Sequence, residues 1–460
     1  MLTDLIRKAP GPRYRAIIDV ISDEIMSGRL SARDRLPTHR ELAHQLDLDT
    51  GTASRAYAEL RRLGLISGEI GRGTFVSEIV RDAPTSMSVT TPADSLIDLS
   101  HNFPLGAPCN PRVTTIVESL IAGGPVDELM TYQVDMGQPR HREAGQAWLE
   151  FQGLRDAGGE VAVTAGAQHG LLLALAALTR HGDRVMTEAV TYFGLKSVAA
   201  LLGLEFVPIE IDEEGLVPES FEKACRETGA KVLCCSPTLH NPTTALMSEG
   251  RRQMIAEISR KFAVHIVEDD VYSFLLEPRV PPICNFAPER TIYVTSLSKC
   301  IGPGLRVGFV RFPHEHAEKI SLAMRASTLM APALTAEIAA RMIRDGAICQ
   351  IAADQRDEMT CRQKLVDELL GGYVMQSHPR SFHIWLQMTN GWSPREFANE
   401  ARRCGVGVAP GEIFAVSPLS RPRAVRVCIS AAQNAAHLQS ALSTLQGILS
   451  GPPHAIAPPV

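Results

Sequence analysis

Two regions of the chain differ in how apolar residues recur along them. Between residues 13 and 77 the apolar positions follow a helical spacing, whereas from Leu96 onward short apolar runs alternate with helical stretches. The second pattern is typical of an α/β domain with a largely parallel central sheet. The clearest runs of this kind are EVAVTAG, DRVMTEA, AKVLCCSP, VHIVEDD, RTIYVTS and LRVGFVRF. The pattern therefore predicts a small helical domain followed by a large α/β domain.

The small domain is predicted to contain three helices and a β-hairpin. The first helix ends at Gly28, and the second begins after Pro37, where Thr38 and Glu41 have the spacing of a capping box. The third helix spans residues 50–63, and the segment LISGEIGRGTFV after it predicts a hairpin around a glycine-rich turn. The predicted inward-facing residues of the three helices are Tyr14, Ile17, Ile18, Ile21, Ile25, Leu42, Ala43, Leu46, Ala53, Ala56, Tyr57, Leu60 and Leu63.

Two helices joined by a short turn and followed by a hairpin form a candidate winged helix-turn-helix. The third helix would enter the major groove of DNA. The residues expected to face DNA are Arg40 on the second helix, Thr50, Thr52, Ser54 and Arg55 on the third, and Arg72 at the hairpin tip. Residues 1–80 contain 12 basic and 11 acidic side chains, so bulk charge gives little support. From the residues alone, a small helical interaction domain remains an alternative.

The stretch LPTHRELAHQLDLDTGTASRAYAELRRLGLISGEIGRGTFV resembles the GntR-type winged helix over nearly the whole small domain. The matching elements are Leu36-Pro37, Arg40-Glu41-Leu42-Ala43, Thr52, Arg55-Ala56-Tyr57, Leu60, Gly64-Leu65 and Gly71-Arg72-Gly73-Thr74. The resemblance implies binding to a double-stranded DNA operator. Many relatives carry an arginine where this chain has Thr50, so base recognition at that position is expected to differ.

Composition and charge restrict the class of protein. The chain has 460 residues, 45% of them apolar and 21% charged, which indicates a soluble globular protein with more than one domain. It contains no run of 18 apolar residues, and its first residues lack the features of a signal peptide, so no membrane span or export is expected. Ten scattered cysteines without a CxxC pair indicate reduced thiols in the cytoplasm and no metal site.

The predicted domain boundaries follow changes in composition. Residues 1–80 form the DNA-binding domain, and residues 81–95, which are polar and contain proline, form a linker. The large domain covers residues 96–449, and residues 450–460 form a loose tail.

Polar residues follow several predicted strands of the large domain. Gly166-Ala167-Gln168 lies between a strand and a helix, where backbone N–H groups can bind an anion. Asp269 ends the run VHIVEDD, at the edge of the sheet where α/β proteins bind ligands. Lys299 and Arg306 follow the next strand, in TSLSKCIGPGLRVGFV. Each feature alone also fits an ordinary turn, a cap or a surface residue.

Taken together and in this order, these features resemble fold-type I pyridoxal-phosphate enzymes, in particular class I and II aminotransferases, over residues 96–449. The resemblance implies a smaller C-terminal α+β part beside the large sheet. It implies that Lys299 forms a Schiff base with pyridoxal 5′-phosphate, and that Asp269 pairs with the pyridine nitrogen and makes the ring a better electron sink. The remaining roles that it implies are a ring-oxygen contact for Asn241 and Tyr272, ring stacking for Tyr192, a phosphate cradle from Ala167, Gln168, Ser296 and Arg306, a contact from Tyr132 to the phosphate of the neighbouring subunit, and a substrate-carboxylate clamp for Arg426.

Two positions depart from the aminotransferase pattern. Thr244 stands where these enzymes usually have the glycine of Asn-Pro-Thr-Gly, and His169 follows Gln168 in the phosphate turn. Neither departure removes an implied cofactor contact.

A GntR-type winged helix followed by an aminotransferase-like domain is the arrangement of the MocR-type regulators. The resemblance implies a cytoplasmic, homodimeric transcriptional regulator that binds pyridoxal phosphate and senses the cofactor, an amine or an amino acid. The competing hypothesis is a working aminotransferase of amino acids that carries a DNA-binding head. A large domain without cofactor is disfavoured because both Lys299 and Asp269 are present.

Overall fold

The computed structural model describes residues 2–8, 12–26, 30, 33–62, 65–69, 73–76, 96–105, 111–155, 158–417 and 422–453. The chain divides into two compact units, Met1–Met87 and Ser88–Val460. The predicted linker, residues 81–95, and residues 454–460 of the predicted tail lie outside the described residues.

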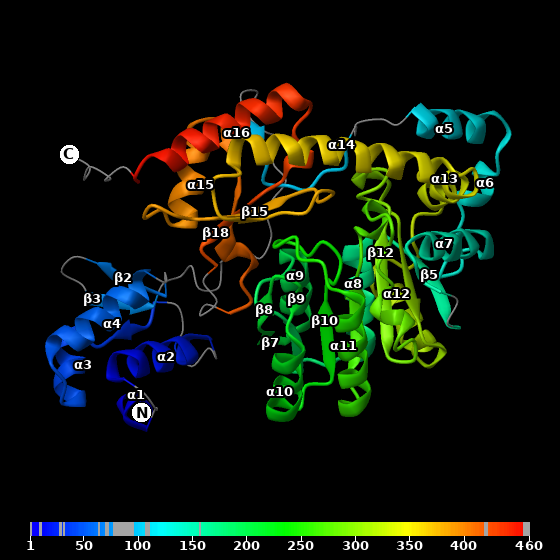
Figure 1. Ribbon diagram of the computed structural model, residues 1–460. Coiled ribbons are helices and arrows are strands. Elements are labelled where there is room, and N and C mark those ends of the chain that lie inside the picture. Colours follow the sequence, from blue (N-terminus) through cyan, green and yellow to red (C-terminus); the bar gives the residue numbers. More distant parts are fainter. Residues whose placement is uncertain are drawn as a thin grey trace. The chain divides into compact units, whose positions relative to one another are not determined.

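The first unit contains the three predicted helices and the predicted hairpin (Figure 1). A further helix, α1 (Leu2–Lys8), precedes them, and its Ile6 is fully buried. Strand β1 (Arg35–Leu36) adds to the hairpin and pairs with β3 in a sheet of order β1-β3-β2. Gly28, Leu63, Gly64 and Arg72 lie outside the described residues. The other elements of this unit are α2 (Arg13–Met26), α3 (His39–Leu46), α4 (Thr50–Arg62), β2 (Ile66–Glu69) and β3 (Gly73–Val76).

The predicted capping box at the start of α3 is confirmed. The N–H of Glu41 donates to Thr38 Oγ1 at 3.2 Å, and the N–H of Thr38 donates to Glu41 Oε2 at 2.7 Å. Two backbone donors that the helix cannot satisfy internally are thereby paired. The box starts α3 so that Leu42 and Ala43 face the core of the unit, where both are buried.

Replacing Thr38 with alanine is expected to destabilise α3 by about 1 kcal/mol, the usual cost of losing an N-cap hydroxyl. Hydrogen–deuterium exchange of the α3 amides in the full chain measures this loss as faster exchange. Thr38→Ser keeps the hydroxyl and serves as the matched control. Equal protection in the alanine and serine variants would contradict the proposed contribution of the cap.

The second unit is built on a seven-stranded sheet of order β5-β13-β12-β11-β10-β6-β7. The strands from β12 to β7 run parallel, whereas β13 is antiparallel to both of its neighbours. The six apolar runs of the sequence form six of these strands, and the prediction of a largely parallel sheet is confirmed. The strands are β5 (Glu160–Thr164), β6 (Arg184–Glu188), β7 (Glu205–Ile209), β10 (Val232–Cys235), β11 (His265–Asp269), β12 (Thr291–Ser296) and β13 (Gly308–Phe312).

Helices cover the sheet, as Figure 1 shows. One cluster of buried side chains combines the strands with α8 (Ala167–Leu178), α9 (Phe193–Leu202) and α12 (Ala317–Ser327). Another combines the strands with α10 (Pro218–Thr228) and α11 (Glu249–Phe262). Because both faces are covered, every strand except the edge strand β7 is buried at most of its positions.

A smaller C-terminal part contains a four-stranded sheet of order β14-β15-β18-β17. The long helix α14 (Ala347–Leu370) contacts both α13 (Ala333–Arg344) and α16 (Ala435–Ser450), so it joins this part to the rest of the unit. The predicted α+β part is therefore present. The first residues of the predicted tail pack on this part, because Trp392 Nε1 donates to the carbonyl of Gly451 at 3.0 Å. The elements of this C-terminal part include β14 (Met375–Gln376), β15 (Ile384–Gln387), α15 (Pro394–Arg403), β17 (Ala409–Pro410) and β18 (Ala424–Val427).

Candidate functional site

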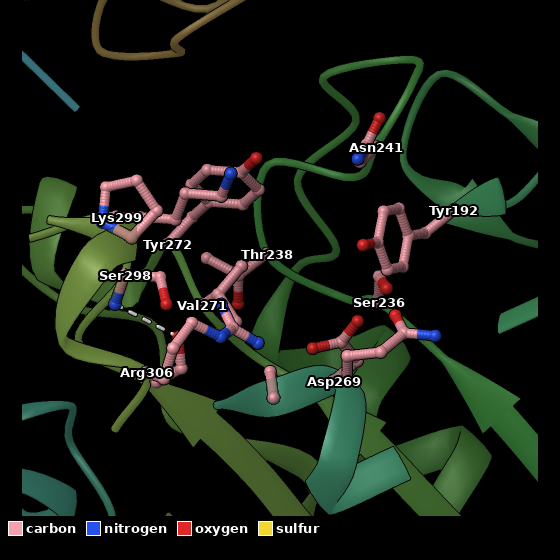
Figure 2. Close-up of a pocket in the computed structure, with 14 residues that line it drawn as sticks. Tyr192, Ser236, Thr238, Asn241, Asp269, Val271, Tyr272, Ser298, Lys299 and Arg306 are labelled. Carbon is pink, nitrogen blue, oxygen red and sulfur yellow. Dashed lines mark hydrogen bonds between the residues drawn. The ribbon is translucent and has the colours of Figure 1, made fainter. Parts of the chain in front are cut away.

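A cavity opens at the carboxyl ends of β11 and β12, beside the first turn of α8 (Figure 2). Nine of the ten residues predicted to contact the cofactor line it: Ala167, Gln168, Tyr192, Asn241, Asp269, Tyr272, Ser296, Lys299 and Arg306. The tenth, Tyr132, does not line this cavity and is 85% exposed. The fold thus brings together residues that are separated by up to 139 positions in the sequence, from Ala167 to Arg306.

Lys299 lies three residues beyond the end of β12, on the turn that follows the strand. Its Nζ donates to the backbone carbonyl of Asn102 at 2.6 Å. The surrounding protein excludes water from the amine and, together with the positive charge of Arg426, lowers the pKa of Lys299 to about 8. An amine with this pKa is neutral more often at physiological pH than an ordinary lysine, which favours nucleophilic chemistry.

Asp269 is the last residue of β11 and lies on the cavity wall. Burial raises the pKa of Asp269 to about 7, and the charges of Asp270 and Glu188 act in the same direction. Its Oδ1 is buried and has no hydrogen-bond partner among the described residues. A buried carboxylate oxygen without a partner is what a protonated ring nitrogen would satisfy, so this residue fits the implied pyridine contact.

Tyr272 and Asn241 also face the cavity. The hydroxyl of Tyr272 accepts a hydrogen bond from Asn102 Nδ2 at 3.0 Å, and burial raises the pKa of Tyr272. Asn241 Oδ1 accepts from Arg426 Nη1 at 2.6 Å. Arg426 on β18 is buried, and its other nitrogen Nη2 donates to the carbonyl of Ser100 at 2.6 Å. The predicted carboxylate clamp therefore lies directly beside the predicted ring contact.

The start of α8 has the geometry of an anion-binding turn. The helix begins after Gly166, whose φ of +84° lies in the region that favours glycine. A Cβ at Gly166 would lie 2.7 Å from Arg306 Nη2, so only glycine lets this guanidinium approach. Gln168 Nε2 donates to the carbonyl of Gly194 at 2.7 Å. The first N–H groups of α8 have no partner within the helix, and Ala167 and Gln168 both line the cavity.

Two further side chains complete the predicted set. Ser296 Oγ accepts a hydrogen bond from the N–H of Ser298 at 3.1 Å, as the dashed line in Figure 2 marks. Tyr192 is the N-cap residue of α9, and burial, followed by the charge of Asp269, raises its pKa to about 12. A tyrosine that stays neutral presents an uncharged ring, which suits stacking on a flat aromatic ligand.

Sequence reasoning missed some of the residues around the cavity. Ser298 stood in the quoted motif without a role, yet it lines the cavity, and its buried Oγ has no partner among the described residues. Asn102, which bonds both Lys299 and Tyr272, carried no signal because it follows no strand that the pattern had predicted. The other lining residues without a predicted role are Ser236, Thr238, Val271 and Pro303.

The Thr244 departure has a local cost. Thr244 has a φ of +66°, in the left-handed region that glycine adopts without steric strain and threonine does not. Its side chain is buried, its N–H donates to the carbonyl of His240 at 2.7 Å, and it does not line the cavity. The substitution therefore strains the turn by about 1 kcal/mol without reaching the cofactor site.

In the first unit, the predicted DNA-facing residues lie mainly on the surface. Arg40 on α3 and Thr50, Ser54 and Arg55 on α4 are exposed. Thr52 is only half-exposed, and its Oγ1 donates to Asp49 Oδ2 at 2.6 Å. The carboxylate of Asp49 also accepts from the N–H of Gly51 at 2.6 Å.

Asp49 therefore caps α4, a role that the sequence pattern did not reveal, and the hydroxyl of Thr52 is partly committed to this cap.

Comparison with known proteins agrees with both units. Residues 94–445 match the family model "Aminotransferase class I and II", and residues 13–76 match "Bacterial regulatory proteins, gntR family". The fold and the site define an aminotransferase-like domain joined to a winged-helix head. The chain belongs to the aminotransferase class I and II family and, within it, to the MocR-type transcriptional regulators that carry a gntR-family DNA-binding domain.

Two curated relatives match over nearly the full chain. The HTH-type transcriptional regulator YdeF of Bacillus subtilis is 31% identical over 444 residues, which cover 96% of each chain. The vitamin B6 salvage pathway transcriptional repressor PtsJ of Salmonella typhimurium is 25% identical and is matched over 88% of this chain and 92% of its own. Among solved structures, the multiple substrate aminotransferase of Thermococcus profundus has a TM-score of 0.72 at 22% identity, over 78% of this chain and 92% of its own.

The cofactor of this family is pyridoxal phosphate, and DNA is the partner of its gntR-type head. Among the described residues, no helix is long and apolar enough to cross a membrane. In the same part of the chain, no group of three or more His, Cys, Asp or Glu side chains could hold a metal ion.

Proposed function

We propose that this regulator holds pyridoxal 5′-phosphate in the cavity beside α8 and that Lys299 is its covalent attachment point. The observation that carries the proposal is the convergence of a lysine of lowered pKa, an unpartnered carboxylate and an anion-binding helix start on one cavity. Asp269 would hold the ring nitrogen in its protonated form, and Tyr192 would stack on the ring. Ala167, Gln168, Ser296 and Arg306 would hold the phosphate, while Asn241 and Tyr272 would bind the ring oxygen. When bound, the cofactor supplies an electrophilic carbon and an electron sink.

The effector is an amine or an amino acid that competes with Lys299, or the cofactor itself. Arg426 supports an amino acid, because its buried guanidinium donates to Asn241, which lines the cavity, and a guanidinium can form two parallel bonds to a carboxylate. The similarity to PtsJ, a vitamin B6 salvage pathway repressor, instead supports the cofactor itself as the signal for this chain. In either case the occupancy of the cavity would alter how the head binds its operator.

A homodimer is part of the proposal. An apolar patch formed by Met130, Tyr132, Val134, Leu329 and Leu334 is exposed on the second unit. Its two segments are adjacent, because the N–H of Gln133 donates to Met330 Sδ at 3.0 Å. Exposed aromatic and aliphatic side chains gathered in one place mark a contact surface, and a second copy there would let Tyr132 reach the partner's cavity. Two heads would then bind two operator half-sites. A regulator of this kind acts on the chromosome, so we place it in the cytoplasm.

Arg40 and Arg55 are expected to support operator binding. If either contacts a phosphate, its alanine variant lowers affinity for all sequences and reduces the salt slope by about one unit. If it contacts a base, the variant loses about 1–3 kcal/mol and relaxes specificity at one position. Operator titration at several salt concentrations measures both effects. Arg15→Ala removes the same charge from an exposed site on α2 and is the matched control. Unchanged affinity in both test variants would remove this surface from DNA binding.

The attachment of the cofactor is expected to depend on pH through Lys299. Only the neutral amine attacks an aldehyde, and a pKa of about 8 leaves about one tenth of the amines neutral at pH 7. The rate should rise as the pH rises towards 8 and level off above it, whereas an ordinary lysine would continue to gain above pH 10. Stopped-flow absorbance after mixing cofactor with the cofactor-free protein measures this profile. A rate that still rises steeply above about pH 9 would contradict the lowered pKa.

A working aminotransferase remains the second candidate function. The specific observation in its favour is that Lys299 and Asp269 line the cavity, while Arg426 lies next to it and donates to Asn241, which also lines the cavity. Turnover of an amino donor with a keto acid tests it directly. Sustained turnover would establish an enzyme, whereas effector-dependent operator binding without turnover would establish a sensor.

A further inference from the structure

His169, the third residue of α8, is buried and uses both ring nitrogens. Its Nδ1 accepts a hydrogen bond from the backbone N–H of Ala165 at 3.1 Å. Its Nε2 lies 2.9 Å from the hydroxyl oxygen of Ser327, at the end of α12. No role in the proposed function has been assigned to this residue, and it does not line the cavity.

These contacts determine which nitrogen carries the proton. A backbone N–H can only donate, so Nδ1 must be unprotonated. The hydroxyl of Ser327 donates to the carbonyl of Ala323 at 2.8 Å, so it accepts from Nε2–H. Burial lowers the pKa of His169, which favours the same neutral ring.

The backbone of Ala165 is consequently held at both its N–H and its carbonyl. Its N–H is bonded to His169, and its carbonyl accepts from Arg306 Nη2 at 3.0 Å. The two neighbours of Ala165 are also joined, because Thr164 Oγ1 donates to the carbonyl of Gly166 at 3.1 Å. This set of bonds fixes the turn that precedes α8, and with it the direction of the first N–H groups of the helix.

We propose that His169 is a positioning residue for the anion-binding turn, and that its Nδ1 holds the Ala165 peptide in the conformation that receives the cofactor's phosphate. The inference rests on the proposed cofactor site. The bond to Ser327 has a lesser role, because it orients the ring from outside the turn.

Two substitutions separate the two ring contacts. In His169→Asn, the amide oxygen occupies the place of Nδ1 and can accept from Ala165, but it cannot reach Ser327. In His169→Gln, the longer side chain reaches toward Ser327 and leaves the N–H of Ala165 without its acceptor. A third variant, Ser327→Ala, removes only the outer contact.

The readout is the preference of the full chain for pyridoxal 5′-phosphate over pyridoxal, which lacks the phosphate, from absorbance titrations of each ligand. His169→Asn and Ser327→Ala should keep the wild-type preference. His169→Gln should reduce this preference about tenfold, a typical effect of leaving one partly buried donor unpaired, through weaker binding of the phosphorylated ligand alone.

Loss of the preference in His169→Asn, or its retention in a folded His169→Gln, would overturn the proposal. The asparagine variant can do so by itself, so the test does not depend on the glutamine variant folding. A wild-type chain that binds both ligands equally would instead refute the phosphate cradle of the proposed function, which is a different result from the failure of His169.

Discussion

A chain in which alanine replaces Lys299 is expected to lose the covalent adduct with pyridoxal phosphate completely. The wild-type protein should show a visible absorbance band that borohydride reduction fixes to the polypeptide, because an amine in the cavity can bind the cofactor's aldehyde. The variant should still fold, since among the described residues Lys299 makes one hydrogen bond, to the carbonyl of Asn102. It should also bind the cofactor more weakly through the contacts that remain. Mass spectrometry of the reduced protein locates the adduct.

Lys196 provides a matched control for this experiment. Burial lowers the pKa of Lys196 to about 8, as it does for Lys299, but Lys196 donates to the carbonyl of Ile413 and does not line the cavity. Lys196→Ala should therefore keep the adduct. An adduct that survives in Lys299→Ala and disappears in Lys196→Ala would show that a reactive amine alone, away from the proposed site, captures the cofactor.

Replacing Arg426 with alanine is expected to abolish the response of operator binding to α-amino acids. Each charge-assisted bond to a carboxylate contributes about 1.5–3 kcal/mol, so losing two of them weakens the effector by about a hundredfold or more. Basal operator binding should persist because the head is untouched. Cofactor attachment should also persist, but its pH profile should move to higher pH, because the charge of Arg426 no longer lowers the pKa of Lys299. Operator titration with a panel of amino acids measures the response.

Two controls make the role of Arg426 specific. Arg426→Lys keeps the charge but loses the planar fork, so it should restore only part of the response. Amines without a carboxylate should act equally on wild type and variant. If an amino acid shifts operator binding equally in both proteins, Arg426 does not bind the effector. If no amino acid shifts the wild type, the cofactor or a simple amine is the signal.

Much of the fold was predictable because local patterns and global packing agree. The six apolar runs became strands because a sheet that is covered on both faces buries most strand positions and so favours short apolar runs. The capping box at Thr38 was visible because its two partners are three residues apart. Strand β7 (Glu205–Ile209) was not among the predicted runs, since it lies at the sheet edge and is partly exposed.

The cavity was predictable only where a residue sits in a short motif next to a strand. Asp269 ends one strand that the pattern had located, and Lys299 follows another. Asn102 lies in an irregular segment that approaches Lys299 across 197 positions, and no local spacing encodes such a contact. The bond between His169 and Ser327 was equally unpredictable, because it spans 158 positions. Whether the assigned residues hold the cofactor as proposed stays a prediction for the experiments above.

The pairing of β15 with β18 places a reporter beside the carboxylate clamp. Trp385 lies directly opposite Arg426 in the antiparallel register, and its ring stands edge-on to Phe414 at 5.9 Å. The guanidinium of Arg426 lies 4.7 Å from the centre of the same Phe414 ring. An indole this close to a charge that changes partners should alter its emission when a carboxylate replaces Asn241 at Arg426. Intrinsic fluorescence can therefore follow effector arrival in the unlabelled protein, independently of DNA.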